Sequence, residues 1–81
     1  MALLNKRNIT RLDKSRNRVH ESVDVTYTSF LGSNGEKYLQ IDTYGTDSRE
    51  IKDKVSQSFQ FDRATGEFLI ELLKKELDLN D

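Results

Sequence analysis

The chain of 81 residues contains no cysteine, no proline and no tryptophan, and it has a single histidine. Without cysteine, neither disulfides nor thiolate metal sites can reinforce the core, so we expect an intracellular, cytoplasmic protein. The apolar start of the chain is too short for the core of a signal peptide, because Lys6 and Arg7 follow directly after Leu4 and Asn5. No later run is long enough to span a membrane, so we expect no membrane partner.

Candidate catalytic and metal-binding groups are also few. His20 precedes Glu21 and lies near Asp24, but neighbouring positions at a strand entrance alternate faces, and no second histidine completes a metal site. The serines lack any other general base, so nucleophilic catalysis is not expected. The four glycines do not form the strand, glycine-rich loop and helix of a phosphate-binding site. We therefore expect no enzyme activity, no cofactor and no metal.

Charge is distributed unevenly along the chain. Residues 1–20 carry 6 basic groups and 1 acidic group, a net charge of +5, whereas the remaining 61 residues carry 7 basic and 13 acidic groups, a net charge of −6. Basic charge on a mobile segment can reach phosphates; an ordinary solvated tail is the alternative. We divide the chain into a basic, mostly flexible arm, residues 1–20, and a single α+β domain, residues 21–81. In the arm we assign Arg16 and Arg18 to phosphate contact.

Alternation of apolar and polar residues predicts the strands of the domain. Val23, Val25 and Tyr27 alternate with polar residues, which is the period of a strand with one buried face. The Asn34-Gly35 pair predicts a tight hairpin, after which the chain returns antiparallel. The predicted strands are Ser22–Phe30, Lys37–Tyr44 and Lys54–Phe61, and a polar loop, Gly45–Asp53, separates the last two. Ile9 and Thr10 favour extended backbone, so we also consider a fourth, short edge strand at Asn8–Leu12.

A C-terminal helix is predicted from Arg63 to Leu77, with Asp62 as its N-cap. At 100° per residue its apolar side chains cover roughly 200°, whereas a helix on one sheet needs a stripe of about 100° or somewhat more. Either the arm or a loop covers the remainder, or a second copy does. Symmetric dimers are the commonest solution, so we expect a homodimer. The side chains that we assign to the dimer interface are Phe68, Ile70, Leu73 and Leu77.

The strand at 37–44 has one unusual side. Tyr38, Gln40 and Tyr44 share it, because side chains alternate across the pleat. Bases stack on aromatic rings while lysine and arginine neutralise phosphates, so such a face suits unpaired nucleic acid. An ordinary solvated sheet face is the alternative interpretation. The cations that would extend the rim of this face are Arg49, Lys52 and Lys54.

The segment 23–77 resembles the family of single-stranded-DNA-binding transcriptional coactivators known as positive cofactor four. The likeness rests on the order of the elements, and chiefly on the YLQIDTYG strand and the SFQFD entry to the helix. The resemblance implies an antiparallel sheet of three to four strands followed by one helix, a dimer formed partly through that helix, and unpaired DNA, in preference to RNA, held on the strands and hairpin loops. The chain departs from the family at 50–54, where EIKDK contains neither proline nor glycine.

A fainter likeness is to short prokaryotic proteins labelled methionyl-tRNA formyltransferase-like. A chain of 81 residues holds neither a folate pocket nor a formyl-transfer site, so the label predicts no function. The sequence thus predicts a non-catalytic α+β homodimer that binds single-stranded nucleic acid, with a role in transcription implied by the coactivator resemblance. The alternative is a dimeric protein-interaction or regulatory module, whose exposed strand edge or helix groove receives another protein.

Overall fold

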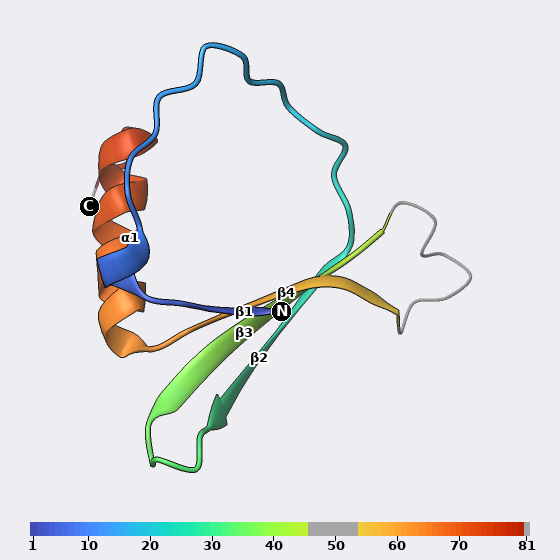
Figure 1. Cartoon of the computed structure of the whole chain (residues 1–81), viewed down its shortest axis with the longest axis vertical. Coiled ribbons are helices and arrows are strands. Elements are labelled where there is room, and N and C mark those ends of the chain that lie inside the picture. Colours follow the sequence, from blue (N-terminus) through green and yellow to red (C-terminus); the bar gives the residue numbers. More distant parts are fainter. Residues whose placement is uncertain (46–53, 81) are drawn as a thin grey trace.

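The computed structural model describes residues 1–45 and 54–80, which form one four-stranded sheet and one C-terminal helix. This α+β fold is the predicted class. The strands lie in the order β1-β4-β3-β2. In chain order the elements are β1 (Ala2–Leu4), the 3₁₀ turn η1 (Lys6–Asn8), β2 (Val25–Leu31), β3 (Lys37–Tyr44), β4 (Val55–Phe61) and α1 (Arg63–Glu76), as Figure 1 shows. No helix in these residues is long and apolar enough to cross a bilayer.

The predicted hairpin is confirmed: β2 and β3 pair antiparallel along their whole length. Two backbone hydrogen bonds close the turn, from the N–H of Gly32 to the carbonyl of Glu36 at 2.8 Å and from the N–H of Gly35 to the carbonyl of Gly32 at 3.0 Å. Gly35 has a φ of +84°, a left-handed conformation that glycine adopts without a steric penalty. The Asn34-Gly35 pair therefore turns the chain where the sequence predicts.

The first strand makes the sheet mixed, so the expectation of a purely antiparallel sheet is wrong. β1 pairs parallel with β4, with Ala2 opposite Phe59 and Leu4 opposite Phe61. β3 occupies one edge of β4, and the apolar start of the chain fills the other edge, which would otherwise expose unpaired backbone groups. The edge strand considered at 8–12 is not formed, and these residues run beside α1 instead (Figure 1).

Helix α1 begins where the sequence predicts but does not lie flat on the sheet. The side chain of Asp62 accepts a hydrogen bond of 2.9 Å from the backbone N–H of Thr65, which is the predicted N-cap. From the junction with β4, the helix and the strands diverge (Figure 1). Among the described residues no apolar side chain is fully buried, and Ser58 and Thr65 are the two buried residues. The hydrophobic core of this chain is therefore incomplete.

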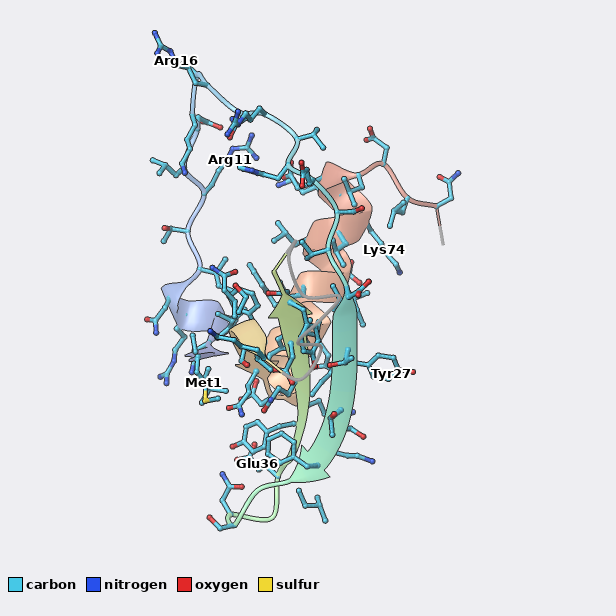
Figure 2. All side chains as sticks on the ribbon, turned by 90° about the vertical axis from the view of Figure 1, so that its right-hand side faces the viewer. Met1, Arg11, Arg16, Tyr27, Glu36 and Lys74 are labelled. Atoms are coloured by element: carbon cyan, nitrogen blue, oxygen red, sulfur yellow. The ribbon has the colours of Figure 1, made fainter. Side chains whose placement is uncertain are left out.

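The other edge of the sheet is open. Every residue of β2 is exposed, and its outer side carries no neighbouring strand among the described residues. Tyr27, which is 78% exposed, points away from the sheet into solvent (Figure 2). Val25 and Leu31 are exposed on the same strand. A strand with apolar side chains and free backbone groups on one edge can pair with another chain.

Candidate nucleic-acid interface

One side of the sheet, which we call the polar face, collects most of the residues that the sequence singles out. The ladder brings side chains of all four strands to this side, because residues opposite one another in a sheet share a face. From β3 it carries Tyr38, Gln40, Asp42 and Tyr44; from β2, Thr26, Thr28 and Phe30; from β4, Ser58 and Gln60; and from β1, Leu3. The predicted grouping of Tyr38, Gln40 and Tyr44 on one face is therefore seen in the pairing register.

A row of hydrogen bonds crosses the middle of the polar face. Ser58 Oγ and Gln40 Nε2 both donate to the carboxylate of Asp42, the second at 3.0 Å. Gln60 Nε2 donates in turn to Gln40 Oε1 at 2.8 Å. Because a carboxylate only accepts hydrogen bonds, Asp42 sets the direction of the whole row. These hydrogen bonds fix the orientation of both glutamine amides. The side-chain carbonyl of Gln60 then lies at the end of the row as an acceptor.

Tyr38 sits at the hairpin end of the polar face. Its ring stacks on Phe30, with centroids 5.8 Å apart and an interplanar angle of 26°. Its hydroxyl accepts a hydrogen bond of 2.9 Å from Asn34 Nδ2. Gly32 lies so close that a Cβ at this position would be 2.8 Å from Tyr38 Cε2. The ring is thus in contact with Phe30 and with the hairpin turn, and it lines a shallow hollow of about 250 Å³ together with Gln60.

Sequence reasoning missed Phe30, Gly32 and Asn34 as parts of this site. A signal for the first of them was present, because a hairpin that turns at Asn34-Gly35 places Phe30 opposite Tyr38. No local pattern indicates that the turn itself folds against the tyrosine ring.

Tyr44 occupies the other end of the same face. Its hydroxyl lies 3.0 Å from Thr26 Oγ1, and its backbone N–H donates to the carbonyl of Asp24 at 3.0 Å. The pairing of β3 with β4 is irregular between Thr43 and Tyr44, which ends the regular ladder there. At about 3.3 Å per residue, Tyr38 and Tyr44 are separated by roughly 20 Å along the strand. The two rings therefore bracket the hydrogen-bonded row.

The centre of this face carries the carboxylate of Asp42, and three of the five predicted cations belong to the described residues. Lys54 is exposed just before β4. Arg16 and Arg18 are exposed on the arm, and Figure 2 shows Arg16 at its outermost part, pointing away from the rest of the chain. Arg49 and Lys52 lie outside the described residues.

Three of the four predicted dimer residues form an exposed apolar strip along α1. Ile70, Leu73 and Leu77 are 53%, 50% and 62% exposed, and at 100° per residue they share one side of the helix. Phe68 is half-buried and lies on the opposite side of the helix, so it does not belong to this strip. Such an exposed apolar strip marks an interaction surface.

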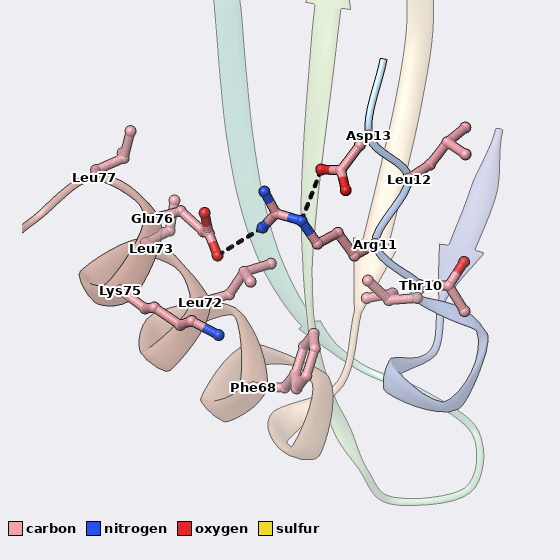
Figure 3. Close-up of a pocket in the computed structure, with 11 residues that line it drawn as sticks. Thr10, Arg11, Leu12, Asp13, Phe68, Leu72, Leu73, Lys75, Glu76 and Leu77 are labelled. Atoms are coloured by element: carbon pink, nitrogen blue, oxygen red, sulfur yellow. Dashed lines mark hydrogen bonds and ion pairs between the residues drawn. The ribbon is translucent and has the colours of Figure 1, made fainter. Parts of the chain in front are cut away.

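Part of the arm lies against this strip and forms a groove of about 560 Å³ (Figure 3). Arg11 spans the groove, with an ion pair of 2.9 Å to Asp13 and another of 3.2 Å to Glu76. The hydrogen bond from Arg11 to Asp13, and then that to Glu76, raise the pKa of the Arg11 guanidinium. Arg11 and Glu76 lie far apart in the sequence, and no local pattern predicts their contact. The groove walls include Leu12 and Leu73.

No cluster of three or more histidine, cysteine or acidic side chains that could hold a metal ion occurs in the described part of the chain. His20 is exposed on the arm. No protein-family model, curated protein or solved structure matches this chain. The functional conclusions therefore rest on the residues of the chain itself.

Proposed function

We propose that the chain binds single-stranded nucleic acid without catalysis, through the polar face of a homodimer. The observation that carries the proposal is the placement of Tyr38 and Tyr44 at the two ends of one face, with an ordered row of amides between them. Every base offers a ring face for stacking, so two tyrosines contribute affinity without strong sequence preference, at about 1 to 3 kcal/mol per stacked base. The side-chain carbonyl of Gln60, at the end of the row, can accept a hydrogen bond from a base edge.

Phosphate contacts complete the proposed interface. Lys54 at the rim, with Arg16 and Arg18 on the arm, supplies positive charge around a face whose centre is acidic. Arg49 and Lys52 belong to the same proposal from their sequence positions. The resemblance to the positive cofactor four family supports DNA in preference to RNA, and a role in transcription. Neutralising phosphates releases counterions, so binding must weaken as salt is added.

The homodimer in this proposal is supported by the apolar strip of α1. Ile70 and Leu73 are about half exposed in the lone chain, and burial against a second copy would remove that surface from water. A two-fold axis lets the same strip serve on both copies. Dimerisation would also place two polar faces in one particle and raise the effective concentration of the second face once the first is bound.

A fluorescence-anisotropy titration tests the proposal with labelled single-stranded and duplex oligonucleotides at low and moderate salt. We expect the single strand to bind more tightly and its affinity to fall with added salt. Joint replacement Arg16→Ser and Arg18→Ser should lower the slope of log K against log salt by about 0.7 for each phosphate that the protein no longer neutralises. Absence of single-strand binding at every salt concentration would disprove the proposal.

A second candidate function is favoured by the open edge of β2. Seven exposed residues with free backbone groups can accept an extended peptide as a fifth strand of the sheet. Affinity of this kind comes from backbone hydrogen bonds and apolar contacts, so it should change little with salt. The same titration therefore separates the two candidates, provided that a partner peptide is tested beside the oligonucleotides.

A further inference from the structure

The lone chain exposes far more surface than its size predicts. Its solvent-accessible surface is 7494 Å², whereas a compact folded chain of 9.4 kDa exposes about 5,000 Å². Its radius of gyration is 14.9 Å, against about 12 Å for a compact domain of this length. The difference in area is roughly 2,500 Å², and an interface of standard size removes only about 800 Å² from each partner. An extensive, obligate type of interface would account for the difference.

The segment 9–24, which we call the spanning segment, is held to the rest of the described chain near its two ends. Figure 1 shows it leaving the side of α1, arching away from the sheet and returning to β2. Its two ends are attached: Arg11 pairs with Glu76 at one end, and the carbonyl of Asp24 accepts from Tyr44 at the other. Between these two attached ends, Asn17 Nδ2 donates a hydrogen bond to the backbone carbonyl of Lys14, which is a local contact three residues away.

Two apolar side chains on the spanning segment are largely uncovered. Val19 is 97% exposed and Leu12 is 73% exposed at the groove beside α1, whereas Ile9 is half-buried there. Holding a segment extended costs conformational entropy, which only contacts can offset. The apolar strip of α1 is exposed as well, and the strands diverge from it. The spanning segment, the strip and the apolar side of the sheet are thus three surfaces of one chain that the described residues leave without full cover.

We propose that a second copy of the chain covers these three surfaces, with its α1 against the spanning segment, so that the two copies interlock. This inference rests on the homodimer proposed above and specifies how it is built. Under a two-fold axis, each copy would insert its apolar strip and each would wrap the other. The surface that the lone chain exposes in excess of a compact chain fits such an extensive interface better than a contact between two helices alone.

Charge also favours a second copy as the occupant. Residues 9–20 of the spanning segment carry four basic groups and one acidic group, a net charge of +3, and residues 21–81 carry −6, so a copy of this chain offers the basic part of the segment an acidic body. Glu67 and Glu71 of α1 are largely exposed, although each is already in an ion pair with a basic residue of the same helix. Arg16 points away from the rest of the chain and stays available to phosphate (Figure 2).

Because the chain has no cysteine, single introduced cysteines can report which surfaces meet. A Val19→Cys chain is refolded together with an Ile70→Cys chain, and a second mixture uses Leu77→Cys, all without nucleic acid. After treatment with a short bismaleimide, we expect a mixed covalent dimer in at least one mixture. The control Ser33→Cys, at the hairpin tip, should give no mixed dimer with either helix variant.

Substitution of the spanning segment gives an independent measurement. In a lone chain Val19 is almost wholly exposed, so Val19→Ser should change nothing. In the interlocked dimer, Val19→Ser removes a buried apolar side chain from each copy, so the dimer dissociation constant should rise about tenfold or more. Ser15→Ala, another exposed change on the same segment, is the matched control.

The outcomes separate this inference from the nucleic-acid proposal. A dimeric molar mass without mixed cross-links, and with Val19→Ser unchanged, would overturn the interlocked arrangement and leave another dimer in place. A monomeric molar mass at micromolar concentration would overturn the second copy altogether. Oligonucleotide affinity is measured in a separate titration, so either result leaves the test of the polar face intact.

Discussion

The backbone N–H of Lys6 donates a hydrogen bond of 3.0 Å to Oγ1 of Thr65, in the first turn of α1. Thr65 is only 1% exposed, which makes it the most deeply buried side chain described. The contact joins the beginning of the chain to the start of its C-terminal helix. It holds η1 against α1 and thereby fixes the direction in which the arm leaves the sheet.

Removing this acceptor should destabilise the fold. Thr65→Val keeps the shape of the side chain but leaves the N–H of Lys6 unsatisfied, so we expect the free energy of unfolding to fall by about 1 to 3 kcal/mol. Urea denaturation followed by circular dichroism measures the change. Thr65→Ser keeps the hydroxyl and should cost less than Thr65→Val. A valine variant as stable as the parent would show that the hydrogen bond contributes nothing.

Loss of the two stacking rings should weaken single-strand binding. If Tyr38 and Tyr44 each stack on a base, the joint change of both to alanine should reduce the binding free energy by about 2 kcal/mol or more. The matched control is Tyr27→Ala, because Tyr27 lies opposite Ile41 and therefore on the other side of the sheet. Equal losses for the two variants, or unchanged affinity of a folded double variant, would argue against the polar face.

The hairpin turn should control the orientation of Tyr38. In Gly32→Ala the new methyl group would lie 2.8 Å from Tyr38 Cε2 and 2.9 Å from Asn34 Oδ1, so the ring must move. We expect an altered near-ultraviolet circular dichroism signal and single-strand affinity lower by severalfold. Gly45→Ala has no neighbour within 4 Å and serves as the control. Identical spectra for Gly32→Ala and the parent would contradict the close contact.

Acid should release the cap of α1. The backbone hydrogen bond from Thr65 lowers the pKa of Asp62 below its ordinary value. A carboxyl whose pKa is lower in the folded chain stabilises the fold at neutral pH, and this contribution disappears as the pH falls below about 4 and passes the folded pKa. Thermal melts of Asp62→Asn, which keeps a capping side chain without its titration, should show a weaker dependence on acid pH than those of the parent. Superimposable pH profiles would contradict a role for the carboxylate.

Local signals account for most of the predicted architecture. Alternation along β2, β3 and β4 reflects the pleat itself, and the Asn34-Gly35 turn and the Asp62 cap depend on neighbouring residues only. The same alternation grouped Tyr38, Gln40 and Tyr44 correctly, because side-chain direction along a strand follows from position. Predicted and observed ends of these elements differ by three residues at most.

Features that depend on residues far apart in the sequence were not predicted. β1 is only three residues long, and its pairing with β4 joins opposite ends of the chain, so no periodicity reveals it. The direction of the amide row depends on Asp42 meeting Ser58 from another strand. The divergence of α1 from the sheet was also missed, since an apolar arc shows that a helix needs a partner but not where that partner lies.

The parallel pairing of β1 with β4 has a consequence for the order in which this chain folds. The hairpin of β2 and β3 closes a short loop and can form early, whereas β1 must wait until β4, near the other end of the chain, is in place. On a ribosome, β1 would thus be made before β4 and dock only after it. Until β1 docks, the outer edge of β4 can pair with strands of other nascent chains. The docking of this three-residue strand is therefore the folding step at which misassembly is most favoured.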